Sequence, residues 1–292
     1  MISIADLKYL DYQIWLRSGE ECAKRLFITQ STISRRNAET LKTLNLKTKR
    51  DEFGEWITEG DTKLLSMERN IHQLYRFSNN EEKLRLEATC WSGPTLATPV
   101  PEGWVNGVWI HVGMIRPLHL IHEGIIDAWI SSYQPDLPEP DNPDFAVIDL
   151  CKTPVKLVAN KRHPLAKKKD ICKQDLESFP SLSLPKGWFP IAEEKFISHG
   201  LWSAEARTIK NWKDLCEEKI KDQTTLSYAT CLGLEVMENL SVLDYDLNLT
   251  SGESLVVKKS LMNSEKVHSL ILCLKERILK KAQTHDELVP TF

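Results

Sequence analysis

The sequence predicts an α/β protein with an all-α N-terminal part, and two observations carry this prediction. In residues 1–45, apolar side chains recur at helical spacing and polar capping residues separate three short segments. Beyond Leu84, short apolar runs alternate with amphipathic segments, as strands alternate with helices in α/β folds. With 292 residues and 41% hydrophobic content, the chain can form two or three modest domains.

The N-terminal part is expected to form a compact helical unit followed by a hairpin. Ser18 and Thr29 are suited to cap its second and third helices, because their hydroxyls can accept backbone N–H groups of the first turn. The expected elements are helices over Ile4–Arg17, Glu20–Leu26 and Gln30 to about Leu44, and a small β wing over Lys47–Thr58 around Gly54.

One longer helix is expected from Gly60 to Ser78. Its apolar residues recur at steps of 3, 4 and 3, the spacing of a coiled-coil seam. They are Leu64, Met67, Ile71 and Leu74. A dimerisation helix and a helix that packs on a neighbouring domain both fit this stripe. Asn79 to Glu82 then looks like a linker.

The remaining chain is expected to alternate strands with helices. We expect strands at 84–88, 107–112, 125–130, 155–159, 182–184, 207–209, 225–230 and 253–260, and helices at 114–123, 174–179, 190–198, 213–220 and 265–281. Pro94, Pro99 and Pro101 oppose a regular helix between Thr89 and Val105, except at its first turn.

Charge is distributed unevenly along the chain. The net charge is −3, yet residues 17–50 hold nine Lys or Arg against three acids, which leaves the remainder near −9. The seven cysteines are scattered and never spaced C-x-x-C, so neither a disulfide framework nor a zinc knuckle is indicated. No signal sequence or long apolar run is apparent, so we expect a soluble, unprocessed cytoplasmic protein that does not enter a membrane.

The third expected helix has two different faces. Ile33, Leu41 and Leu44 cluster on one side of a helical wheel. The other side and the first turn carry Gln30, Ser31, Thr32, Ser34, Arg35 and Lys42. These side chains suit DNA, because Arg pairs with guanine, Gln pairs with adenine, and Ser or Thr adapts to either. An ordinary solvated helix face remains the alternative.

The run Ser18 to Leu46, SGEECAKRLFITQSTISRRNAETLKTLNL, resembles the winged helix-turn-helix of LysR-type transcriptional regulators. The matching positions are Leu26, Ile28, Thr29, Gln30, Ser31, Ile33 and Ser34, after the small pair Cys22-Ala23. Ile57-Thr58-Glu59-Gly60 is similar to the close of the family's wing. Later stretches match the family in order, at Leu84–Leu86, Glu123–Ile130 and Val158–Ala166.

This resemblance implies a domain organisation. Residues 1–60 would form the winged helix-turn-helix and 61–82 the linker helix that dimerises. Two Rossmann-like α/β subdomains, similar to a type II periplasmic binding protein, would follow. Subdomain I would take 83–158 plus 257–292, and subdomain II would take 159–256. A small-molecule effector would lie in the cleft between them.

The resemblance also implies a function and its residues. The chain would be a sequence-specific transcriptional regulator without enzymatic activity or cofactor. It would bind a roughly palindromic double-stranded DNA as a homodimer, with two dimers pairing into a tetramer. Base edges would be met by Gln30, Ser31, Ser34 and Arg35. Phosphates would be met by Thr29, Thr32, Arg36 and Thr58, with Lys49 and Arg50 of the wing on the backbone or minor groove.

The pocket departs most from the family pattern, because the prolines fall where an effector-binding helix normally begins. Ser92 and Thr95 are the closest equivalents of the effector contacts. A ligand-independent regulator with a degenerate pocket is therefore the first alternative. Trp91, Trp104, Trp109 and Trp188 could line an aromatic cleft or simply pack in cores.

A third hypothesis is a small-molecule enzyme in the α/β portion. His119 and His122 stand three residues apart with Glu123 adjacent, and could be ligands of a metal. The order of the residues differs from H-E-x-x-H, and packing or solvated histidines explain them as well. We therefore expect no metal site and no catalytic residues.

Overall fold

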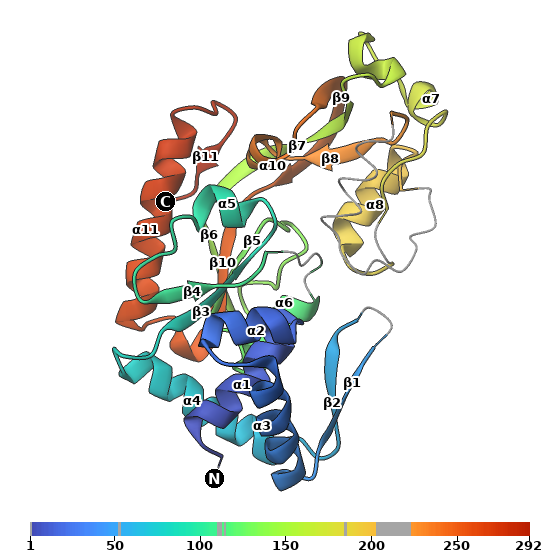
Figure 1. The fold of residues 1–292 in the computed structure, drawn as a ribbon. Helices are drawn as coiled ribbons and strands as arrows, with labels where there is room; N and C mark the ends of the chain where they lie inside the picture. Colours follow the sequence, from blue (N-terminus) through green and yellow to red (C-terminus); the bar gives the residue numbers. More distant parts are fainter. Residues whose placement is uncertain (1, 52–53, 110–112, 114, 184–185, 203–222) are drawn as a thin grey trace.

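The computed structural model describes residues 2–51, 54–109, 113, 115–183, 186–202 and 223–292 (Figure 1). The strand expected at 207–209 and the helix expected at 213–220 lie outside these residues. Within the described ranges, no helix combines the length and the apolar content needed to cross a bilayer.

The N-terminal unit has the expected three helices and hairpin. They are α1 (Ile4–Leu16), α2 (Gly19–Leu26), α3 (Gln30–Thr43), β1 (Lys47–Arg50) and β2 (Trp56–Glu59). Both predicted caps are confirmed, since Ser18 accepts the Glu21 N–H and Thr29 accepts the Thr32 N–H, each at 3.2 Å. The helices enclose a core that includes Leu7, Trp15, Cys22 and Ile33.

Helix α4 (Lys63–Ser78) turns its polar side to the protein and its apolar side outward. The inward residues Glu68, Arg69, His72, Gln73 and Arg76 are buried. The outward residues are Leu64, Met67, Ile71 and Leu74, which are 54%, 65%, 57% and 59% exposed. This arrangement is the reverse of an ordinary amphipathic helix on a monomer, which buries its apolar stripe.

The first lobe is built on a five-stranded sheet of order β4-β3-β5-β10-β6. Its strands are β3 (Leu84–Ala88), β4 (Trp104–Asn106), β5 (Ala128–Ser131), β6 (Phe145–Asp149) and β10 (Ser254–Lys258). Strand β3 pairs in parallel with β4 and β5, whereas β10 runs antiparallel to β5 and β6. The accompanying helices are α5 (Ser92–Leu96), α6 (Ile115–His122) and α11 (Glu265–Ala282), and α11 buries Val267, Leu270, Leu274 and Ile278.

The second lobe is built around the long strand β7 (Cys151–Asn160). It pairs with β8 (Ser227–Ala229), β9 (Leu240–Ser251) and β11 (Val289–Pro290). The helices of this lobe are α7 (Lys173–Leu176), α8 (Pro190–Ser198) and α10 (Cys231–Val236), with a 3₁₀ turn at Pro164–Lys167. Figure 1 shows the end of this lobe that carries α7 on the far side of the molecule from α3.

The chain passes from one lobe to the other at two crossings, and strand pairing puts these crossings at different residues from the boundaries at 158 and 257 expected from the sequence. Strand β6 ends at Asp149 in the first sheet, and β7 begins at Cys151 in the second. On the return, β9 ends at Ser251 and β10 begins at Ser254. The crossings therefore lie near 150 and 252, because β7 already pairs with β11 from Cys151 onward.

Several other elements differ from expectation. Of the strand expected at 107–112, residues 107–109 are not in a strand and 110–112 lie outside the described residues; the strand beside β3 is β4, where Trp104 to Asn106 pair with Leu84 to Leu86. Strands β6, β9 and β11 and helix α10 were not predicted at all. The prolines around 94–101 do shorten the helix after β3, which survives only as the five residues of α5.

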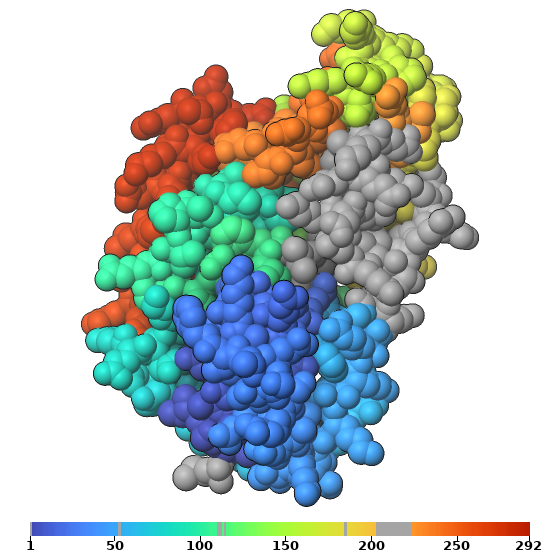
Figure 2. Space-filling model, viewed as in Figure 1, coloured from blue at the N-terminus to red at the C-terminus, as the bar shows by residue number. Residues whose placement is uncertain are grey.

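The N-terminal unit packs directly on the first lobe (Figures 1 and 2). Leu7, Trp15 and Ile33 belong to the same buried cluster as Ile121 and Ile125 of the first lobe. The Trp15 indole N–H also donates to the buried Glu87 carboxylate on β3, at 2.6 Å. This contact leaves the opposite face of α3 free of the lobes.

Candidate functional site

The outer face of α3 is open to solvent. Ile33, Asn37 and Thr40 are buried on its inner face, and Asn37 donates to the Gln13 side chain at 2.5 Å. Leu41 and Leu44 pack against the same core, as the helical wheel predicts. The exposed residues are Thr29, Gln30, Ser31, Ser34, Arg35 and Arg36, while Thr32 is half-buried. The two faces of the helix are therefore confirmed.

The two arginines of α3 differ in their surroundings. Arg35 forms no ion pair or hydrogen bond with any residue that the structure describes. Arg36 lies 3.8 Å from the Asp6 carboxylate and 3.7 Å from that of Glu39. Arg35 is consequently the guanidinium most available to a partner, whereas Arg36 is held at the side of the helix.

Two other residues that are proposed to contact DNA, Thr29 and Arg50, form hydrogen bonds within the N-terminal unit. The Thr29 hydroxyl lies 2.9 Å from the hydroxyls of Ser31 and Thr32 and caps α3. Arg50 donates to the carbonyls of Gly54 and Arg17 at 2.9 and 2.7 Å, and its guanidinium stacks 4.6 Å above the Trp56 ring.

The rest of the wing is more open. Lys49 forms an exposed pair with Glu59 at 2.5 Å, and half-buried Thr58 stands opposite Thr48 in the hairpin. Arg50 thus shapes the turn of the wing, and Lys49 is the freer of its two cations.

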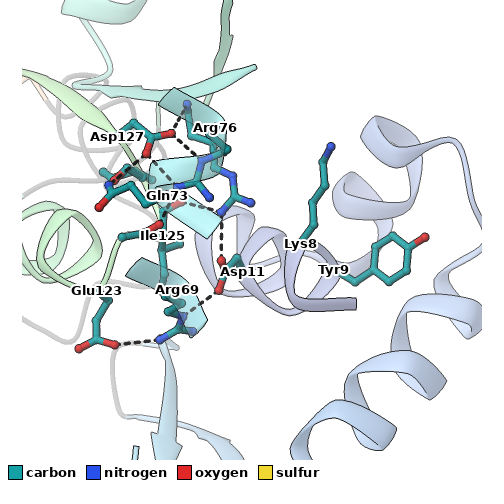
Figure 3. A network of polar contacts seen from close by, with 12 residues as sticks. Lys8, Tyr9, Asp11, Arg69, Gln73, Arg76, Glu123, Ile125 and Asp127 are labelled. Carbon is teal, nitrogen blue, oxygen red and sulfur yellow. Dashed lines mark hydrogen bonds and ion pairs between the residues drawn. The ribbon is translucent and has the colours of Figure 1, made fainter. Parts of the chain in front are cut away.

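A buried ionic network connects the N-terminal unit to α4 and to the first lobe (Figure 3). Asp11 of α1 is 1% exposed and accepts hydrogen bonds from two guanidinium groups. Arg69 of α4 donates to one carboxylate oxygen at 2.9 Å, and Arg85 of β3 donates to the other at 3.2 Å. Arg69 also reaches Glu123 at 2.9 Å. We call these four residues the Asp11 network.

A second buried pair fixes α4 on the first lobe. Arg76 donates to both oxygens of Asp127, at 2.8 and 3.0 Å, and to the Gly124 carbonyl. Burial alone would lower the pKa of Arg76, but the charge and hydrogen bonds of Asp127 raise it above its ordinary value. The bidentate geometry explains why the polar side of α4 faces inward.

A cavity of about 130 Å³ opens between the two lobes. Trp91, Ser132 and Tyr133 line it from the first lobe. From the second lobe it is lined by Val155, Leu182, Phe189, Phe196, Trp202, Tyr228, Met237 and Leu249, among others. We call it the inter-lobe cavity, and most of its wall is apolar.

Aromatic rings form two groups on this wall. Phe196 stacks on Tyr228, with centroids 3.8 Å apart and planes at 15°, and on Trp202 at 5.5 Å and 13°. Across the cavity, Tyr133 lies 4.6 Å from Phe189 and 6.2 Å from Trp91, centroid to centroid. A flat ring between these groups would meet aromatic faces and edges from both lobes.

A buried carboxylate stands behind the polar part of this wall. Glu253 is fully buried beside the second lobe crossing. It accepts hydrogen bonds from Ser92 at 2.5 Å and from Ser132 at 2.6 and 2.7 Å. Burial raises the pKa of Glu253 to about 7, although these hydrogen bonds oppose the rise. We call Glu253, Ser92 and Ser132 the Glu253 cluster.

The residues expected to hold an effector are placed elsewhere. Ser92 is buried against Glu253, and the Thr95 hydroxyl donates to the Trp91 carbonyl at 2.6 Å. Neither side chain is among those that line the inter-lobe cavity. Of the Glu253 cluster, Ser132 is the member that lines the inter-lobe cavity.

Of the four tryptophans considered from sequence, Trp91 lines the cavity. Trp104 packs in the core of the first lobe, and Trp109 lies so close to Gly93 that a Cβ there would approach its ring to 2.2 Å. The sequence reasoning missed Tyr133, Phe189, Phe196, Trp202 and Tyr228. Apart from a high aromatic content, it held no signal that would have found them.

The histidine pair on α6 has a different setting from a metal site. Glu123 is engaged with Arg69, and burial lowers the pKa of His119. No group of three or more His, Cys, Asp or Glu side chains suited to hold a metal occurs in the described part of the chain.

The comparisons agree with this geometry. Residues 108–216 match the family described as the LysR substrate binding domain. The structure is similar to CbnR, a LysR family transcriptional regulator, with a TM-score of 0.54 at 15% identity over 94% of this chain and 99% of that one. CbnR complexed with its target DNA gives a TM-score of 0.53, at the same identity and coverage.

A further similar structure is an OxyR mutant of Corynebacterium glutamicum, with a TM-score of 0.51 at 13% identity over 97% of this chain and 94% of that one. A search of curated protein sequences gives no match. The fold is therefore that of a full-length LysR-type regulator. The resemblance predicted from the sequence is confirmed by these matches, in which the family model covers residues 108–216.

Proposed function

We propose that this chain is a sequence-specific, DNA-binding transcriptional regulator that works as a homodimer and responds to a small molecule in the inter-lobe cavity. The observation that carries the proposal is the outer face of α3, where exposed polar and basic side chains surround an unpaired Arg35. The cationic segment 17–50 on an otherwise acidic chain adds support, since phosphates attract this charge.

A symmetric dimer would give one short helix its specificity. Two copies of α3 would read two half-sites a whole number of turns apart, so the operator should be roughly palindromic. Dimers are expected to pair further, as the resemblance implies, and the cytoplasmic location expected from the sequence suits a DNA-binding protein. Mapping genomic binding sites tests this directly, because a shared palindrome names both the target and the spacing.

Arg35→Ala is expected to remove base preference at one position of each half-site, at a cost of about 1–3 kcal/mol there. Arg36→Ala is the matched control on the same helix. Because Arg36 lies at the side, it should weaken binding to all sequences alike and reduce the salt dependence. Footprinting and competition with single-base operator variants measure both effects. Unchanged base preference in Arg35→Ala would defeat the assignment.

Ile71→Glu is expected to convert the dimer into monomers at micromolar concentration. Ile71 is 57% exposed at the centre of the outward stripe of α4, so a dimer through this face would bury a charge at its seam. Sedimentation equilibrium measures the change. Leu272→Glu on α11, at another exposed leucine, is the control and should leave the dimer intact. A stable Ile71→Glu dimer would place the interface elsewhere.

Control by a ligand is favoured over a ligand-independent regulator by the inter-lobe cavity. A degenerate pocket would be expected to collapse or fill with side chains, yet a cavity of about 130 Å³ stays open among the described residues of the two lobes. Closure of the lobes on a ligand would change how the subunits are placed in the dimer. Thermal-shift measurements with small molecules test this, since a ligand that binds only the folded state raises the melting temperature.

A further inference from the structure

Two serine hydroxyls at or behind the first-lobe wall of the inter-lobe cavity already donate to a carboxylate of the chain itself. On the first lobe, the hydroxyls of Ser92 and Ser132 donate to Glu253. The Trp91 indole N–H donates to Ser132 in turn, at 2.6 Å. A hydroxyl carries a single hydrogen, so neither serine has a second one to offer a ligand.

A second carboxylate is engaged where the first lobe meets α8. Asp136, which follows β5 in the first lobe, lines the cavity and accepts the backbone N–H groups of Ile191 and Ala192, at 2.7 and 3.1 Å, where α8 begins. Burial raises the pKa of Asp136, although these two bonds oppose the rise. The backbone donors that could have held an anion at this helix are therefore occupied as well.

No Lys, Arg or His stands among the described residues that line the cavity. A ligand carboxylate or phosphate would leave water to meet the Asp136 carboxylate and apolar rings, with no cation among these described lining residues to compensate its charge. An uncharged ring would lose little hydration and would gain the stacked faces described above. The charges around the cavity and its aromatic wall therefore both disfavour an anionic ligand.

We propose that the inter-lobe cavity takes an aromatic molecule that carries no negative charge. The inference rests on the proposed function, because it specifies the chemical class of the effector. It also assigns a role to Asp136, which lines the cavity, and to Glu253, which lies behind Ser132, because a negative charge on either side chain would repel an anion.

Two matched series of probes test the inference on the full-length chain by isothermal titration calorimetry. Each series keeps one ring and changes only the charge of its side chain: tryptophol, tryptamine and indole-3-acetate, then phenethyl alcohol, phenethylamine and phenylacetate. We expect the alcohol or the amine of at least one series to bind at least tenfold more tightly than the acid. Tightest binding by the acids, or no binding in either series, would overturn the inference.

Variants that each remove one carboxylate charge show which residues cause the difference in affinity between the probes. Glu253→Gln is expected to narrow the difference in affinity between alcohol and acid at least threefold, because the amide removes the charge and can still accept a serine hydrogen bond through its one carbonyl oxygen. Asp136→Asn removes the other carboxylate. It is an independent test if Glu253→Gln does not fold, which circular dichroism checks. Glu276→Gln, an exposed carboxylate on α11, is the control and should leave the difference unchanged. An unaltered difference in both cavity variants would contradict the role of these carboxylates.

The same samples are assayed for DNA binding by mobility shift, which separates this inference from the proposed function. Wild-type protein that binds DNA yet prefers the acids would overturn the ligand class alone. Wild-type protein that binds the uncharged probes yet no DNA sequence specifically would defeat the proposed function and leave the ligand class standing.

Discussion

Replacing Asp11 with asparagine is expected to lower the free energy of unfolding by about 3–5 kcal/mol. The side chain is 1% exposed and is the carboxylate shared by Arg69 and Arg85. Asparagine has nearly the same shape but no charge, so the two guanidinium groups would keep only Glu123 as a charged partner in the Asp11 network. Leaving one buried charge without its partner lowers the free energy of unfolding by far more than the intact ion pair raised it.

Urea unfolding followed by circular dichroism measures this loss. Glu276→Gln removes a carboxylate from an exposed pair with Lys280 and should shift the urea midpoint only slightly. The double variant Asp11→Asn with Arg85→Met should lose less than the sum of the two single variants, because it removes both members of a buried pair. Equal midpoints for wild type and Asp11→Asn would contradict the network's role.

The position of Asp11 gives this loss a consequence for function. Of the Asp11 network, only Asp11 belongs to the N-terminal unit, whereas its partners lie on α4, on β3 and after α6. A weakened network should therefore free α1 from the first lobe before either lobe unfolds. Limited proteolysis between α3 and α4 should then become faster in Asp11→Asn than in wild type.

The N-terminal elements were predictable because their determinants are local. A hydroxyl at Ser18 or Thr29 caps the helix that begins at the next residue, and periodicity in α3 separates Ile33 from Arg35. The exposed stripe of α4 was also readable from spacing, although spacing alone left open whether it faces another domain. Its burial of Arg69 and Arg76 instead decides that the stripe faces outward.

The networks and the cavity were not predictable because they join distant residues. Asp11 and Arg85 are 74 positions apart, and Ser92 and Glu253 are 161 apart. From sequence, Ser92 was assigned as an effector contact only through the family resemblance. The carboxylate that accepts its hydrogen bond arrives on the return from the second lobe, after β9, a strand whose alternating LSVLDYDLNLTS pattern was overlooked.

Glu253 should make the stability of the protein fall as the pH rises toward neutrality. Its pKa in the folded chain is about 7, against an ordinary value of 4.5. Between these values the folded state keeps a proton that the unfolded state has lost, so raising the pH favours unfolding. The full effect is about 3 kcal/mol, of which about 2 kcal/mol falls between pH 5.5 and 8.5.

Glu253→Gln isolates this contribution, because the amide cannot titrate while every other group is shared with wild type. Relative to the variant, wild type should lose about 2 kcal/mol of unfolding free energy between pH 5.5 and 8.5, measured by urea unfolding at each pH. Glu276→Gln should instead follow wild type throughout, since its carboxylate is exposed. Parallel curves for wild type and Glu253→Gln would mean that Glu253 is already ionised at pH 5.5. In that case Ser92 and Ser132 would stabilise the charged carboxylate enough to offset its burial, and the cavity floor would carry a full negative charge over the whole range.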